Sequence, residues 1–330
     1  VVAAAAGIMV FLTVTQSIYF IGDRNAFQKI GRVFFRNTLG KMLILSVICT
    51  LVCKPLFHSG TGGGVQADPF QIFDMILQIV PTDIVSPVLN GSILQILFIA
   101  VCLGVTLLLL GNRVTLVKQF IDQCCDIVNH IMEYILRLMP YSIGMSIFTL
   151  ITGGKLSSLG RVVKLLIVFV VFTLATILWN VLYTCLIRKK NIPAYLRDTL
   201  PVLITSFTTA SSAAALPIGM DICEQKLGID KKFITFGAPM SMAVFKPGGV
   251  IYRVVLAFGL AEIFGVSITT LWMITCILLS FCLSIAVPAI PGGGMSVLTL
   301  LLSQLGIPSE ALALALACDI IMDSLSTACN

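Results

Sequence analysis

The chain has 330 residues, of which 58% are hydrophobic and 11% are charged, and its mean hydropathy is +1.05. Soluble domains carry about twice that share of charged residues, so the composition excludes an ordinary soluble domain and indicates a membrane protein with several transmembrane helices. The net charge of +6 does not indicate nucleic-acid binding, because the Lys and Arg residues fall between apolar runs. Eleven Cys without a C-x-x-C pair and only two His argue against a metal site built from these residues.

Five apolar runs approach the roughly 20 residues that a helix needs to cross a bilayer. They cover residues 1–21, 42–57, 93–110, 165–187 and 268–287. For the first part of the chain we predict helices over 1–21, 29–57, 70–110 with breaks near Pro81 and Pro87, 120–151 and 160–187. The loops 22–36, 111–118 and 188–197 are rich in Lys and Arg and alternate with loops that contain few of these residues. This pattern places the basic loops on the cytoplasmic side of the cell membrane. The first run lacks the basic region of a signal peptide, and we expect a sequence trimmed at both ends.

Residues 198–228 are too apolar for a loop and too interrupted for one spanning helix. Their centre, TTASSAAALP, is a run of hydroxyl-bearing and small residues that ends in Pro217. We predict a re-entrant hairpin of two short helices, whose exposed backbone groups at the tip line a protein or water-filled cavity. Residues 278–306 repeat the pattern, with apolar arms on both sides of SIAVPAIPGGG.

A helix with an unusual feature follows each hairpin. Residues 236–252 contain Lys246 and a Pro-Gly-Gly break, and residues 315–330 contain two aspartates. At 3.6 residues per turn, one polar face of this last helix carries Asp319, Asp323, Ser326, Thr327 and Asn330. A hairpin followed by an unusual helix, twice, predicts an all-α polytopic, inverted-repeat secondary transporter that binds its substrate between the two hairpin tips.

Five stretches of the chain resemble a known family. They are IVPTDIVSPVLNGSILQILFIAVCLG (79–104), RLMPYSIG (137–144), TTASSAAALPIGM (208–220), SIAVPAIPGGGMSVLTLLLSQLGIP (284–308) and DIIMDSLSTACN (319–330). In this order they resemble the dicarboxylate/amino acid:cation symporter family, which contains the glutamate and neutral amino acid carriers. The resemblance implies a homotrimer in the lipid bilayer. It assigns residues 1–195 mainly to the trimerisation scaffold, with part of the transport domain, and residues 196–330 to the core of the transport domain.

The resemblance also implies substrate-binding residues. The family's aspartate for the substrate's α-amino group corresponds to Asp323, and its polar partners correspond to Thr327 and Asn330. Acidic amino acid carriers have an arginine where this chain has Ser326, and a serine cannot neutralise an acidic side chain, so a small neutral amino acid is favoured over an acidic one. The hairpin tips supply the remaining candidates, which are Ser211, Ser212 and Ala213 for the substrate carboxylate, and Ile290, Pro291 and Gly292.

The cation sites match the family poorly. Where the family has Asn-Met-Asp-Gly-Thr, this chain has Ser-Met-Ala-Val-Phe at 241–245 and lacks the carboxylate that would coordinate sodium. Candidate oxygen ligands remain at Gly237, Ser241, Ser284 and Asn330. We expect no cofactor apart from Na⁺ or H⁺ as a coupling ion.

Lys246 lies one residue after this altered motif, in an apolar stretch. A Lys within a membrane segment needs a partner, and we expect Asp319 or Asp323. One hypothesis is that its ammonium replaces a sodium ion, so that coupling is weak, absent or to protons. The alternative is that Lys246 extends from the helix break to the membrane interface. Asp319 either takes part in coupling or only braces its helix.

Three classes of function remain open. The first is secondary transport of a small amino acid or related carboxylate by alternating access. The second is a transport-deficient relative that acts as a sensor or an anion channel. The third, an intramembrane aspartyl protease, is disfavoured, because such enzymes place their aspartates on two helices, whereas Asp319 and Asp323 lie one turn apart on one helix. We therefore expect a transporter and not an enzyme.

Overall fold

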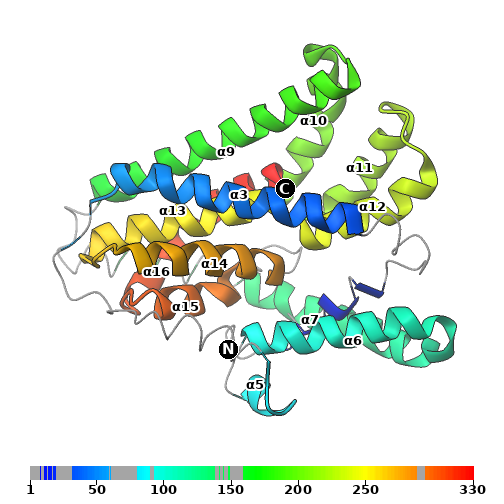
Figure 1. Cartoon of the computed structure of the whole chain (residues 1–330), viewed down its shortest axis with the longest axis horizontal. Coiled ribbons are helices and arrows are strands. Elements are labelled where there is room, and N and C mark those ends of the chain that lie inside the picture. Colours follow the sequence, from blue (N-terminus) through cyan, green and yellow to red (C-terminus); the bar gives the residue numbers. More distant parts are fainter. Residues whose placement is uncertain are drawn as a thin grey trace.

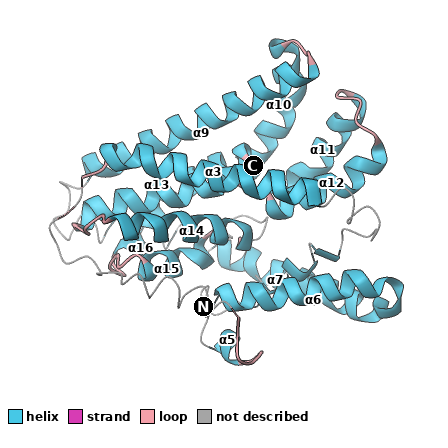
Figure 2. Ribbon diagram, viewed as in Figure 1, coloured by secondary structure: helices cyan, strands magenta, loops and turns pink. Residues whose placement is uncertain are grey.

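The computed structural model describes residues 32–58, 60, 80–89, 93–137, 159–287 and 294–330, with scattered single positions between 8 and 19 and between 141 and 148. The regular secondary structure of these residues is helical, which confirms the all-α prediction (Figure 2). Within this part of the chain, four segments are long and apolar enough to cross a membrane: Arg36–Leu56, Phe98–Val128, Gly160–Arg188 and Phe233–Phe264.

The first half of the chain follows the predicted order of helices. Its elements are α3 (Arg32–Leu56), α5 (Ser86–Leu89), α6 (Ile93–Leu110), the 3-10 helix η2 (Gly111–Val114), α7 (Thr115–Arg137) and α9 (Leu159–Arg188). The expected break near Pro81 is present, since residues 80–85 are not helical, whereas Pro87 lies inside the short helix α5. The prediction of a loop over 111–118 is wrong. Gly111, at φ +58°, supplies a turn that a residue with a side chain rarely adopts, and the chain resumes a helix at once. Predicted helix 1–21 lies mostly outside the described residues.

The first predicted hairpin is formed by α10 (Ile192–Thr209) and α11 (Ser212–Gln225), which pack against each other (Figure 1). Its tip is only Ala210 and Ser211, shorter than expected, and Pro217 lies inside α11. Ala210 is left-handed with φ 48°, and the Ser211 side chain accepts a hydrogen bond from the Ala214 N–H at 3.2 Å. Ser211 is therefore the N-cap of α11, which explains how a serine-rich tip reverses the chain sharply.

The broken helix consists of α12 (Lys231–Val244) and α13 (Pro247–Phe264), separated by Phe245 and Lys246. The break follows from Pro247, which has no N–H to donate and disfavours a helical conformation in the preceding residue, but suits the first position of a new helix. α13 lies at the centre of the molecule, against α3, α9, α14 and α16, and all its residues from 247 to 261 are buried. α9 in contrast exposes large apolar side chains, with Trp179 68% and Leu186 78% exposed, as suits a lipid-facing helix.

The second predicted hairpin comprises α14 (Thr270–Ala286) and α15 (Met295–Gln304), which are in contact with each other. α14 begins earlier than the predicted residue 278, because Thr269 caps it by accepting a hydrogen bond from the Trp272 N–H at 3.1 Å. Residues 288–293 of the tip lie outside the described residues. The last helix, α16 (Ala311–Cys329), packs against α13, α9, α10 and α15. This arrangement brings the ends of α10, α12 and α14 next to the C-terminal half of α16 (Figure 1).

Candidate functional site

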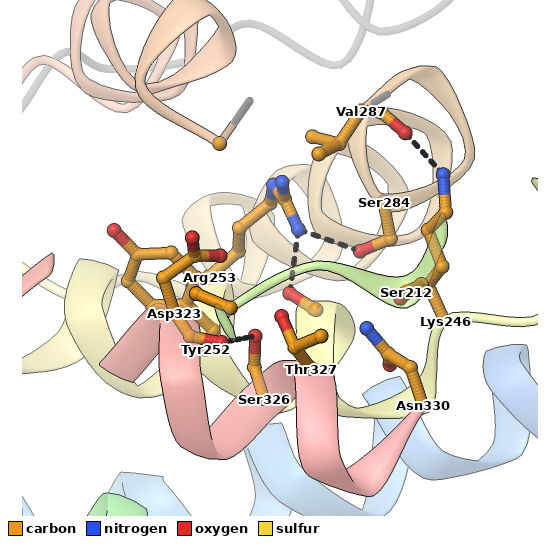
Figure 3. A pocket seen from close by; sticks show the side chains of 13 residues that line it. Ser212, Lys246, Tyr252, Arg253, Ser284, Val287, Asp323, Ser326, Thr327 and Asn330 are labelled. Atoms are coloured by element: carbon orange, nitrogen blue, oxygen red, sulfur yellow. Dashed lines mark hydrogen bonds between the residues drawn. The ribbon is translucent and has the colours of Figure 1, made fainter. Parts of the chain in front are cut away.

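A small cavity of about 30 Å³ lies where the first hairpin tip, the α12–α13 break, the C-terminal end of α14 and the last turns of α16 meet (Figure 3). Its lining is mostly polar and comes from each of these elements. The lining residues are Ala210, Ser212, Lys246, Gly249, Tyr252, Arg253, Ser284, Val287, Gly294, Asp323, Ser326, Thr327 and Asn330. The predicted meeting of the two hairpins with the two unusual helices thus occurs at one place.

The face of α16 that lines the cavity carries the predicted polar stripe, with Asp323, Ser326, Thr327 and Asn330 in the lining. We call this face the α16 wall. Asp319 lies one turn earlier and is 1% exposed, and its Oδ1 accepts a hydrogen bond from the Tyr252 hydroxyl of α13. A carboxylate buried in an apolar protein needs such a donor, because desolvation of an unpaired charge costs several kcal/mol. Asp319 therefore connects α16 to α13, while Asp323 faces the cavity.

The glycines of the helix break allow α16 to approach the backbone closely. A Cβ atom on Gly248 would lie 2.2 Å from the Ser326 carbonyl oxygen, a distance that real Cβ atoms do not reach. The Gly248 N–H donates to Oδ1 of Asn330 at 2.9 Å. Only a residue without a side chain fits here. The Pro-Gly-Gly sequence therefore both breaks the helix and allows α16 to pack directly against its backbone.

Lys246, in the break, is 5% exposed. Its Nζ donates to the backbone carbonyl of Val287 at the end of α14, and its backbone N–H donates to Sδ of Met42 at 3.4 Å. The expectation that its partner is Asp319 or Asp323 is wrong, and so is the alternative that it extends to an interface. The reason is that the last carbonyls of a helix have no intrahelical partner, and the end of α14 presents one of them to the ammonium.

Arg253 is a second buried cation that the sequence analysis did not identify. It is 2% exposed in the middle of α13, and its Nη1 donates to the Gly249 carbonyl at 2.7 Å and to Ser284 Oγ at 3.0 Å (Figure 3). Its Nε has no hydrogen-bond partner among the residues that the structure describes. Charged residues are rare inside membrane segments, so an arginine in the apolar run VIYRVVLAF was the signal that could have pointed to it. We call Lys246, Arg253 and Ser284, with the backbone around them, the α13–α14 wall.

The other candidate residues are distributed as follows. Ser212 lines the cavity, whereas Ser211 caps α11 and the exposed Ala213 is not part of the lining. Gly237 and Ser241 lie in α12 and are absent from the lining. Ile290, Pro291 and Gly292 lie outside the described residues, although Val287 and Gly294 on either side of them both reach the cavity. Among the described residues, no group of three or more His, Cys, Asp or Glu is placed to hold a metal ion.

The model of the sodium:dicarboxylate symporter family matches residues 4–330. The chain belongs to this family. It is 27% identical to the proton/sodium-glutamate symport protein of Bacillus subtilis (strain 168), over 98% of this chain and 80% of the relative. It is 29% identical to the C4-dicarboxylate transport protein of the same organism, over 95% of this chain and 78% of the relative. It is also 22% identical to the serine/threonine transporter SstT of Bifidobacterium adolescentis, over 99% and 78%.

Membership of the symporter family confirms the predicted resemblance and class: an integral membrane transporter rather than an enzyme. The family name implies sodium, and the candidate oxygens of this symporter can be tested against its geometry. Ser284 Oγ accepts from Arg253, Asn330 Oδ1 accepts from the Gly248 N–H, and the Ser241 carbonyl accepts from the Phe245 N–H. None of these three oxygens belongs to a carboxylate, and the first of them borders a guanidinium. They therefore offer a sodium ion no anionic ligand and, at Ser284, a neighbouring positive charge.

Proposed function

We propose that the protein is a homotrimeric secondary transporter that moves a small neutral amino acid across the cell membrane by alternating access. The observation that supports this most is that charges of both signs surround one cavity. Asp323 lies in the α16 wall, and Lys246 and Arg253 lie in the α13–α14 wall. Asp323 can pair with the ammonium of an amino acid, and buried charges of both signs in a membrane protein mark substrate pathways.

The substrate class follows from Ser326, which lines the cavity beside Asp323. Its hydroxyl donates to the Asp323 carbonyl at 3.0 Å, so this position offers no positive charge for an acidic substrate side chain. Ser212 at the first residue of α11 lies across the cavity, near the N–H groups of a helix N-terminus that suit a carboxylate. A serine/threonine transporter among the relatives is consistent with a small neutral substrate.

Coupling is the second part of the proposal. The motif at 241–245 lacks the carboxylate that the family has, and two cationic side chains lie at the cavity. We therefore infer that a sodium gradient does not drive uptake, and that transport is coupled to protons or proceeds by exchange. Lys246 in this proposal acts as a tethered cation. The two aspartates and the two cations around the site balance in formal charge, so that substrate binding needs no additional ion.

The test is uptake of radiolabelled serine, threonine, alanine, glutamate and succinate into proteoliposomes, with sodium, proton and no gradients imposed in turn. We expect saturable uptake or exchange of the neutral amino acids that does not depend on sodium. Asp323→Asn is the matched control, and its uptake at low substrate concentration should be much weaker. Glutamate uptake driven by sodium would contradict both parts of the proposal. Binding of a neutral amino acid with no transport under any gradient would instead favour a sensor or an anion channel.

A further inference from the structure

We propose that Arg253 is a built-in cation that joins the C-terminal end of α14 to the α12–α13 break through the oxygens of Ser284 and Gly249, so that no sodium ion is bound at these oxygens. The inference rests on the proposed function and deepens its coupling. It concerns a residue that the resemblance does not assign, and it accounts for the bond that one candidate sodium oxygen, Ser284 Oγ, already makes.

The first support is the pair of oxygens that the guanidinium binds. Nη1 donates to a backbone carbonyl of the break, Gly249, and to a hydroxyl of α14, Ser284, at 2.7 and 3.0 Å. Backbone carbonyls and hydroxyls are the kinds of oxygen that hard cations use as ligands. Ser284 in turn donates to the Ser280 carbonyl of its own helix at 2.5 Å. The hydroxyl proton of Ser284 thus points away from Arg253, and a lone pair of the hydroxyl oxygen accepts the hydrogen bond from the guanidinium. A metal ion would bind the same lone pair.

The second support is the position of these oxygens in the fold. Gly249 belongs to the first turn of α13 and Ser284 to the last turn of α14, so a single nitrogen joins the break to the arm that leads into the second hairpin tip. A Cβ atom on Gly249 would lie 3.0 Å from Nη1 of Arg253. The guanidinium therefore fills the space at the bend of the chain, and an ion placed at the same oxygens would meet a fixed like charge.

The third support is Lys246, which binds the same arm from the other side of the break. Its Nζ donates to the Val287 carbonyl, which follows the last residue of α14. The C-terminal end of a helix carries a partial negative charge and unpaired carbonyls, so two cations there stabilise the end of α14. The second hairpin is thus held at Ser284 and Val287 by protein side chains.

The fourth support is the lack of a direct carboxylate partner. Within the described residues Arg253 forms no ion pair, and the two carboxylates that act on it electrostatically, Asp323 and Asp319, lie on α16. Nearby, the Tyr252 hydroxyl is bonded to Asp319. The hydrogen bonds of this buried arginine therefore go to a carbonyl and a hydroxyl, which are neutral oxygens. A metal cation binds oxygens of this kind, whereas a salt bridge would need a carboxylate.

The experiment uses the full chain, purified and reconstituted in lipid nanodiscs. Serine affinity and the thermal unfolding midpoint are measured in sodium chloride and in choline chloride at equal ionic strength. For the wild type we expect the same affinity and the same midpoint in both salts. For Arg253→Met, which keeps length but removes charge, we expect serine affinity in choline to fall about tenfold or more and sodium to restore part of it. Arg253→Lys keeps a cation and is expected to stay indifferent to sodium.

Arg188→Met, on the exposed end of α9, is the matched control and should behave like the wild type in both salts. A wild-type affinity or midpoint that rises specifically with sodium would overturn the inference. So would an Arg253→Met protein that is monodisperse and binds serine equally in the two salts. If that sodium-independent affinity were also weaker than in the wild type, Arg253 would instead bind the substrate carboxylate. If the wild type binds none of the solutes, the proposed substrate class is wrong, and the midpoint in the two salts still tests this inference.

Discussion

The α16 wall and the α13–α14 wall of the cavity differ in what their charged groups do. On the α16 wall, Asp323 faces the cavity and the backbone is an uninterrupted helix. On the α13–α14 wall, Lys246 and Arg253 point at oxygens of the second hairpin, and the backbone is interrupted twice, before Pro247 and after Ala286. The negative charge of Asp323 thus faces the open space of the cavity, while the two positive charges are used to hold the end of α14 at the helix break.

The largest effect is expected where the two walls touch. In Gly248→Ala the new Cβ atom would lie 2.2 Å from the Ser326 carbonyl, and neither backbone can move without opening the site. We expect a loss of about 3 kcal/mol of stability, seen as a strongly lowered thermal midpoint and a poor yield of monodisperse protein. Gly219→Ala is the control, because its Cβ atom would meet only Val202 Cγ2 at 3.9 Å. Equal behaviour of the two variants would show that the walls are not in close contact.

The next largest effect is expected at the bond between the walls. Tyr252→Phe removes the hydroxyl that donates to Asp319, whose carboxylate is 1% exposed and would remain without this partner. We expect destabilisation by about 2 kcal/mol, measured by thermal or denaturant unfolding in nanodiscs. Tyr183→Phe on the exposed surface of α9 should change nothing measurable. Adding Asp319→Asn to Tyr252→Phe should cost less than the sum of the single changes, and strict additivity would argue against the bond.

A smaller effect, confined to ligand binding, is expected on the α16 wall. Asp323→Asn removes the negative charge of a half-buried residue in the cavity lining, so serine affinity should fall about tenfold while the fold is retained. Affinity is measured by isothermal titration or by competition with a radiolabelled ligand. Asp221→Asn, at an exposed position of α11, provides the charge-matched control. An Asp323→Asn protein with unchanged affinity would remove the α16 wall from substrate binding.

The smallest effect is expected at the first hairpin, which belongs to neither wall. Ser211→Ala removes the side chain that accepts the Ala214 N–H, and we expect a loss of about 1 kcal/mol in stability. Ser211→Asp should keep the cap and the thermal midpoint, and Ser211→Gly should lose only a fraction of the alanine effect. If alanine and aspartate at this position gave the same midpoint, the cap would not be what holds the tip.

Much of the fold could be predicted from local patterns. The run of small and hydroxyl residues around Ser211 predicted a sharp reversal, and Pro247 predicted the break in the helix, because both act on the backbone within a few residues. The first tip is shorter than predicted, because Pro217 lies inside α11 and does not end that helix. The loop predicted over 111–118 is wrong for a similar reason, because one glycine was enough to turn the chain and a helix follows directly.

The site could be predicted in part. The spacing of Asp323, Ser326, Thr327 and Asn330 follows from the helical period, and the structure places all four in the cavity lining. The partner of Lys246 could not be read in this way. We expected a carboxylate as the partner of the ammonium, but the ammonium binds the Val287 carbonyl, 41 residues away in sequence. Arg253 was missed because its role depends on Ser284, 31 residues further on, which reaches it only when α14 packs against α13.

The sequence by itself determined that this protein is an all-helical membrane transporter with two helix pairs, a broken helix and a polar stripe on its last helix. These features rest on hydrophobic run length, helical period and the backbone chemistry of Pro, Gly and Ser, which act between near neighbours. The tertiary structure decided which oxygens meet which cations, and it brought Gly248 against Ser326 and Arg253 against Ser284. Those pairings depend on how α13, α14 and α16 pack together, because hydrogen bonds between distant segments form only at the distances that packing sets.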